Sequence, residues 1–80
     1  MKNVKDEECL VFLRNIAYLR KKNGLSKKEM ANLLGISVYS ITKIENGIFP
    51  KNLKAEVIYN IYKKFKIKPS EQFSQIFAED

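Results

Sequence analysis

The sequence predicts an all-α domain of five helices, and three observations support this prediction. Apolar residues recur at steps of three and four along most of the chain, which is the period of helices that bury one face. Residues that begin helices, such as serine, and glycines that end them divide the chain into short segments. Finally, 80 residues, of which 45% are hydrophobic and 11% aromatic, are enough for one packed core and too few for two domains.

The first helix is expected over residues 7–22. Three apolar residues recur at helical spacing and would form its buried face: Phe12, Ile16 and Leu19. The basic residues at 20–22 stand where cations suit the negative end of a helix. Gly24 would then end the helix.

The second helix begins with a predicted capping box. Ser26 and Glu29 have the Ser-x-x-Glu spacing in which each side chain accepts a hydrogen bond from the other residue's backbone amide. Apolar residues follow as far as Leu34, and Gly35 would end the helix after about two turns.

The third helix follows almost at once. Ser37 would cap a segment from Val38 to Asn46, with Gly47 as the stop. Only Gly35 and Ile36 separate it from the second helix, so the two helices cannot be antiparallel neighbours in a bundle. They must turn sharply, as the helices of a helix-turn-helix unit do.

Two further helices complete the prediction. The fourth is expected from Leu53 to Lys66 with Asn52 as its cap, after a loop that ends at Pro50. Its buried residues would be Leu53, Ile58, Ile61 and Phe65. The fifth is expected to begin at Pro69. We therefore expect a single domain over residues 7–77, between flexible ends at 1–6 and 78–80.

The net charge of +6 favours an anionic partner. Between Arg14 and Lys68, thirteen Lys and Arg residues stand against three Asp and Glu residues. Such a field attracts nucleic acid or an anionic membrane surface. The membrane surface is the weaker interpretation, because the basic residues flank a compact motif and do not line one face of a long amphipathic helix. No apolar run approaches the roughly 20 residues of a membrane span, so a cytoplasmic protein is expected.

The composition argues against an enzyme. The chain contains no His, the commonest general base at neutral pH, so each Ser or Tyr lacks the group that usually activates a nucleophile. The lone Cys9 excludes an internal disulfide and, without His, leaves no zinc site of the usual kinds. We expect no catalytic residue, no metal, no cofactor and no small-molecule ligand.

The segment with the second and third helices resembles a known family. It reads LSKKEMANLLGIS at residues 25–37 and ITKIENG at residues 41–47. This pattern is similar to the Cro/C1-type (XRE) family of phage repressors and small bacterial regulators, and the similarity extends from about Phe12 to Phe73. The resemblance implies a five-helix, lambda-repressor-like DNA-binding domain. In that domain helix 3 lies in the major groove, helix 2 crosses the backbone, and a dimer commonly binds a palindromic operator.

The outward face of the third helix is the candidate reader of DNA sequence. On a helical wheel with Ile41 and Ile44 turned inward, Tyr39 and Lys43 point away from the core. Lys43 has the chemistry to donate to guanine O6 and N7, and the Tyr39 ring can meet a thymine methyl group. The residues assigned to base reading are Val38, Tyr39, Ser40 and Lys43.

The residues around this face are assigned to the DNA backbone. They are Ser26, Lys27, Lys28, Ser37, Thr42, Asn46, Lys51 and Asn52. Lys27 departs from the family pattern, because similar proteins often carry a Gln there that bridges a phosphate and the recognition helix. The Lys27 ammonium adds positive charge that suits a phosphate, but it does not reproduce the bridging role of the neutral Gln amide. The lysines at 63, 64, 66 and 68 are interpreted as a solvated face.

Two assignments concern scaffold and assembly. By resemblance, Arg20 and Glu45 match a pair that ties helix 1 to helix 3, and two separate surface charges are the alternative. A homodimer seam is assigned to Phe73, Ile76 and Phe77, with Tyr59 or Tyr62 beside them. The alternative is that these residues close the bottom of the core, which is the favoured role for Phe73.

The leading hypothesis is sequence-specific binding of double-stranded DNA by a small transcriptional regulator, a repressor that occupies its operator. The alternative is an antitoxin or antirepressor whose helix-turn-helix fold mainly grips a partner protein, and fold alone does not separate the two. The exposed face of the third helix argues for DNA, since a protein-binding face usually carries more apolar area. Such a regulator is expected in the cytoplasm, associated with the nucleoid.

Overall fold

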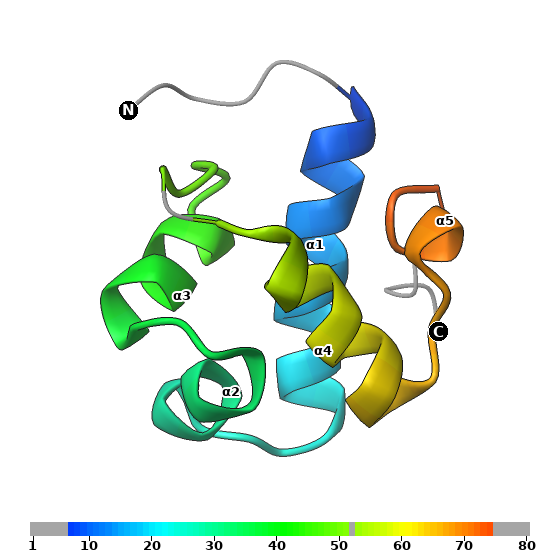
Figure 1. Ribbon diagram of the computed structural model, residues 1–80. Helices are drawn as coiled ribbons and strands as arrows, with labels where there is room; N and C mark the ends of the chain where they lie inside the picture. The colour runs from blue at the N-terminus through cyan, green and yellow to red at the C-terminus, as the bar shows by residue number, and fades with distance from the viewer. Residues whose placement is uncertain (1–6, 52, 75–80) are drawn as a thin grey trace.

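The computed structural model describes residues 7–51 and 53–74. Over these residues it contains five helices and no strand, as the sequence predicts (Figure 1). The helices are α1 (Glu7–Lys22), α2 (Lys27–Leu34), α3 (Val38–Glu45), α4 (Ala55–Phe65) and α5 (Pro69–Gln72). The all-α, five-helix class is therefore confirmed.

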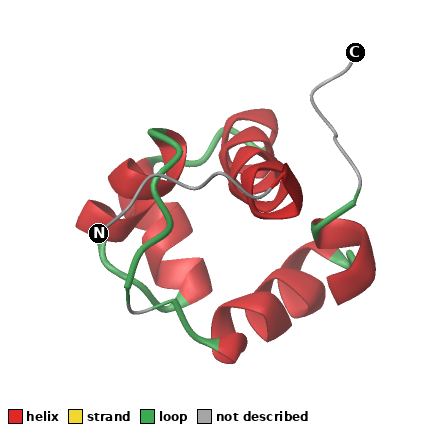
Figure 2. Ribbon diagram, turned by 90° about the horizontal axis from the view of Figure 1, so that it is seen from above, coloured by secondary structure: helices red, strands yellow, loops and turns green. Residues whose placement is uncertain are grey.

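The core lies where the four longer helices meet. Helix α1 contacts α3 and α5, while α2 contacts α3 and α4, and Figure 2 shows α1 nearly end-on with the other helices beside it. The buried apolar side chains are Phe12, Leu13, Ile16, Leu19, Met30, Ala31, Leu34, Ile41, Ile44, Val57 and Ile61. Their removal from water is the main favourable contribution to the fold. In the part of the chain that the structure describes, no helix is long and apolar enough to cross a membrane.

Local hydrogen bonds fix the connection between α2 and α3. The backbone N of Glu29 donates to Ser26 Oγ (3.0 Å), and the backbone N of Ser26 donates to Glu29 Oε1 (2.7 Å). At the other end of α2, Gly35 has φ +78°, a left-handed conformation that favours glycine. Asn60 of α4 donates to Leu34 O (3.0 Å), so α4 holds this turn from behind. The predicted capping box and glycine stop are confirmed.

Helix α4 begins later than the sequence indicates. The expected start at Leu53 is wrong, because Lys54 keeps an extended conformation, makes no side-chain cap bond, and precedes the first helical residue, Ala55. Leu53 is a partly buried loop residue packed against the core. This anchoring keeps the chain out of the helix for two further residues. The predicted cap, Asn52, lies outside the described residues.

The buried face of α4 also differs from the prediction. Its buried residues are Val57 and Ile61, whereas Ile58 and Phe65 are only partly buried. The face is turned toward α2, which α4 contacts directly. The helix ends at Phe65, one residue before the expected end, because Lys66 adopts a left-handed φ of +61°.

Helix α5 is a single turn held by two buried amide side chains that the sequence did not reveal. Asn15 on α1 donates to the backbone O of Gln72 (2.8 Å). The Nε2 of Gln72 donates to Ile58 O (3.1 Å) and to Ile67 O (2.9 Å). Only 2% of Asn15 and 1% of Gln72 are exposed, so these bonds are made inside the core.

Phe73 follows α5 and closes the core. Its ring stacks on that of Phe12, with 4.4 Å between centroids and 3° between planes. This is the role that the sequence favoured for Phe73 over a place in a dimer seam. The other two residues assigned to the seam, Ile76 and Phe77, lie outside the described residues.

Candidate nucleic-acid interface

The outer face of α3 exposes large side chains that the core does not use. Ile41 and Ile44 are buried, as the helical wheel predicts, while Tyr39 is 69% and Val38 43% exposed. The ammonium of Lys43 lies 4.7 Å from the centroid of the Tyr39 ring. Because a cation at this distance is attracted to an aromatic face, the exposed Tyr39 and the half-buried Lys43 form one unit on the outward-facing side of α3.

Two serines organise the start of α3. Ser37 Oγ accepts a hydrogen bond from the backbone N of Ser40 (3.1 Å), and the two hydroxyls are 3.2 Å apart. Ser37 is therefore the N-cap, as predicted. Ser40 is half-buried and lines a hollow together with Lys54 and Glu56. Of the four residues assigned to base reading, Ser40 is thus the one that lies toward the start of α4.

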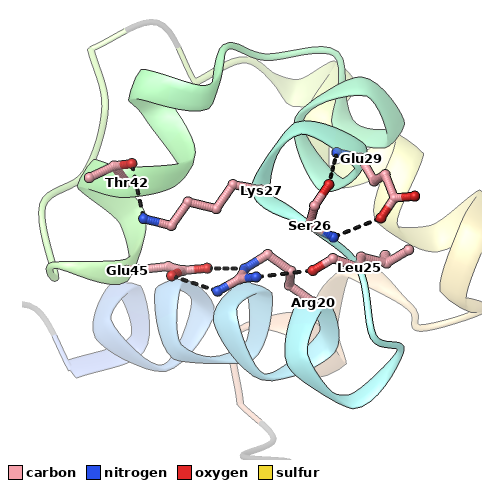
Figure 3. A network of polar contacts seen from close by, with 7 residues as sticks. All are labelled: Arg20, Leu25, Ser26, Lys27, Glu29, Thr42 and Glu45. Atoms are coloured by element: carbon pink, nitrogen blue, oxygen red, sulfur yellow. Dashed lines mark hydrogen bonds and ion pairs between the residues drawn. The ribbon is translucent and has the colours of Figure 1, made fainter.

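Lys27 connects α2 to α3. Its ammonium donates to Thr42 Oγ1 (3.3 Å), and Figure 3 shows the side chain reaching across from the first turn of α2. An ammonium has three donors, so this contact leaves others available to a second acceptor. Both residues were assigned to the DNA backbone from the sequence, but their contact with each other was not foreseen.

An ion pair anchors the end of α3 to α1. Arg20 Nε is 2.5 Å from Glu45 Oε2, and Arg20 Nη2 is 3.1 Å from Glu45 Oε1, so the guanidinium binds the carboxylate through two nitrogens (Figure 3). Arg20 Nη1 also donates to Leu25 O (3.0 Å), so the same side chain is bonded to the loop before α2. The two side chains are 17% and 14% exposed, so water reaches them only at the edge.

The positive charge of Arg20 is stabilised by its partner. The hydrogen bond to Glu45 is the largest reason why the pKa of Arg20 lies above its ordinary value; burial opposes this shift, and the charge of Glu45 adds to it. Arg20 is therefore charged at every pH at which the protein would be studied.

The remaining candidates lie around this network. Lys28 and Lys51 are exposed, and Asn46 is exposed where α3 ends. Ser26 is exposed, and its hydroxyl oxygen accepts the capping-box hydrogen bond from the backbone N of Glu29. Asn52 lies outside the described residues.

The candidate interface thus combines outward-facing side chains on α3 with polar contacts that tie this helix to α1 and α2. Tyr39 and Lys43 project from α3, while the Arg20–Glu45 pair and the Lys27–Thr42 bond hold the helix from two neighbouring elements. The sequence signal that identified the first pair was the resemblance. The Lys27–Thr42 pair has only a weak signal in the sequence, which is that Thr42 is a polar residue on the side of α3 nearest the start of α2.

Comparison with known proteins adds one finding. The sequence matches a family model described as a helix-turn-helix domain over residues 14–76, which takes in the C-terminal half of α1 and the four other helices. No curated protein and no solved structure matches the chain significantly.

Proposed function

Since this chain belongs to the helix-turn-helix domain family, of the Cro/C1 or XRE type, we propose that it is a small transcriptional regulator. It binds a specific sequence of double-stranded DNA and represses by occupying its operator. The family and the five helices identify the fold as lambda-repressor-like. The observation that carries the proposal is the outward-facing Tyr39–Lys43 unit on a helix anchored from behind.

In this proposal α3 enters the major groove and reads base edges. Lys43 donates to a guanine, and Tyr39 and Val38 contact a thymine methyl group. The cation–π contact holds Lys43 beside Tyr39 before DNA arrives, so less side-chain freedom is lost on binding. Ser40 has a smaller share, because its hydroxyl is engaged with Ser37.

The lysines near the start of α2 and after α3 hold the phosphates. Lys27, Lys28 and Lys51 supply charge that carries no sequence information but fixes the position of the protein on the duplex. Lys27 also links the phosphate contact to α3, because the same ammonium donates a hydrogen bond to Thr42. The Lys27 ammonium would thus bind a DNA phosphate and, at the same time, hold α3 in its position.

The assembly proposed with this function is a homodimer on a palindromic operator, which places two copies of α3 one DNA turn apart. The proposed domain spans residues 7–77 and works in the cytoplasm, at the nucleoid, as a binding protein and not as an enzyme.

The experiment that tests the function is a selection of bound sequences from a random duplex pool. We expect enrichment of one motif. The logarithm of the binding constant for that motif should fall linearly with the logarithm of the salt concentration, with a slope of about −0.9 per phosphate neutralised. A pool that shows no enrichment, with no binding at low salt, would refute the proposal. Capture of a partner protein through the same face would then favour the antitoxin or antirepressor alternative.

A further inference from the structure

The C-terminal half of α4 carries a second basic face that the proposed function does not use. We define it by Tyr59, Tyr62, Lys63 and Lys66. We propose that this basic face binds the phosphate backbone of a second duplex DNA segment, without reading its sequence. One molecule would then contact two segments of DNA at once.

Two tyrosines on this face are exposed without a structural reason. Tyr59 is 57% and Tyr62 45% exposed, and apart from Val38 and Tyr39 on α3 they are the only large hydrophobic side chains so exposed among the described residues. Lys63 places its ammonium 5.5 Å from the centroid of the Tyr59 ring. The face therefore repeats the tyrosine–lysine pairing of α3, on a helix that does not belong to the helix-turn-helix unit.

Lysines outnumber carboxylates around these tyrosines, although the exposed Glu56 lies one turn before Tyr59 on the same helix. Residues 57–70 contain four lysines and no Asp or Glu. On another side of α4, Lys22 and Lys64 line a groove of about 350 Å³ between the ends of α1 and α4, which adds to the positive charge of this end of the molecule. None of these lysines forms an ion pair with a carboxylate of the described residues. The helix dipole favours cations at the C-terminal ends of α1 and α4, but clustered like charges repel one another, so a polyanion would relieve the repulsion.

The basic face lies away from α3. In Figure 1, α3 lies at the left of the molecule and the C-terminal end of α4 at the lower right. A duplex in contact with α3 therefore leaves the basic face open. In this proposal the phosphate backbone at the basic face therefore belongs to a second segment.

The side chains fit a backbone better than the other anionic partners. Lysine ammonium and tyrosine hydroxyl groups are both common donors to DNA phosphates. The stretch from Tyr59 to Lys66 rises about 10 Å along the helix axis, at about 1.5 Å per residue, which is long enough to pass more than one phosphate. A membrane-surface helix, by contrast, buries a broad apolar face, and here the exposed apolar area is limited to the two tyrosine rings.

The test asks whether one molecule holds two duplexes. A biotinylated duplex is immobilised and saturated with the full chain, a fluorescent duplex of scrambled sequence is added, and its retention is measured at several salt concentrations. The wild-type protein should retain it. The variant Lys63→Gln with Lys66→Gln should lose retention, and its salt slope for the second duplex should fall by about two units, one for each lysine. Affinity for the immobilised duplex should stay unchanged.

Matched controls separate charge from folding and from α3. Lys63→Arg with Lys66→Arg keeps both cations and should retain the second duplex, and thermal melts check that every variant is folded. Tyr59→Phe should weaken retention if its hydroxyl donates to phosphate. The variant Tyr39→Ala with Lys43→Ala disables the reading surface, and it should still bind scrambled duplex at low salt through the basic face.

Several results would overturn the inference. A dimer could bridge two duplexes with its two copies of α3, and that bridge would survive the glutamine variant and disappear in the α3 variant. Binding of polyglutamate or of phosphatidylserine vesicles that depends on Lys63 and Lys66, without retention of duplex, would assign the face to another partner. The proposed function has its own test: it is refuted if the variant Tyr39→Ala with Lys43→Ala keeps full affinity for the selected site, whatever the result at the basic face.

Discussion

Replacing Glu45 with alanine is the sharpest test of how α3 is held. The substitution removes the acceptor of two charged hydrogen bonds, at 2.5 and 3.1 Å, and leaves Arg20 with only the carbonyl of Leu25. A fully buried pair costs about 3–5 kcal/mol when one partner is removed, and an exposed pair costs at most about 1 kcal/mol. Both side chains here are less than one-fifth exposed. We therefore expect a loss of about 2–3 kcal/mol in the free energy of unfolding.

A loss of this size is easy to measure in so small a domain. Each kcal/mol corresponds to about 4–8 °C in melting temperature for a chain of 60–100 residues, so the melt should shift down by roughly 10–20 °C. Circular dichroism at 222 nm would follow it. DNA affinity should fall in the same variant at a temperature where it remains folded, because α3 loses its anchor and not a base contact.

The control is Glu56→Ala, which removes an exposed carboxylate from the first turn of α4. It should change stability by no more than about 0.5 kcal/mol. Arg20→Ala with Glu45→Ala completes a double-mutant cycle, in which the coupling energy isolates the pair from the loss of each side chain alone. Equal melting temperatures for the Glu45 and Glu56 variants, with no coupling in the cycle, would show that the pair does not hold α3.

Three further outcomes follow from the interface and its turn. Lys43→Ala or Tyr39→Ala should cost about 1–3 kcal/mol on the selected site and relax discrimination at one or two base positions; equal losses on selected and scrambled duplexes would mean that α3 does not read sequence. Lys27→Ala should weaken binding to all sequences alike and reduce the salt slope by about one unit; a loss confined to the selected site would contradict a phosphate role. Gly35→Ala should lower stability by about 1–2 kcal/mol in a thermal melt, because φ at this position is +78°, and an unchanged melt would contradict the left-handed turn.

The helix-turn-helix unit was predictable because its signals are local. The capping box of Ser26 and Glu29 and the left-handed stop at Gly35 depend on residues at most four positions apart, so the sequence specifies them directly. The same holds for the outward face of α3, since the burial of Ile41 and Ile44 fixes the rotation of the helix. The exposed Tyr39 then follows from helical geometry alone.

Features that depend on distant parts of the chain were missed. The start of α4 is set by the packing of Leu53 against a core built mostly from other helices, and local capping signals do not report that packing. Asn15 lies on the same face of α1 as Phe12, Ile16 and Leu19, but the helical pattern does not show that its partner is the backbone of Gln72 on α5. The bond between Lys27 and Thr42 depends on the angle between two helices, which the sequence does not state.

The amide network at α5 determines how precisely the C-terminal end of the domain is located. Apolar side chains tolerate small sliding movements, whereas a hydrogen bond requires a particular partner at a particular distance. Gln72 contacts α1, α4 and the loop before α5 at once, through Asn15, Ile58 and Ile67. A helix of four residues has no stability of its own. Its single allowed register is therefore dictated from the interior, and a partner that contacts α5 meets it in a defined position and direction relative to the rest of the fold.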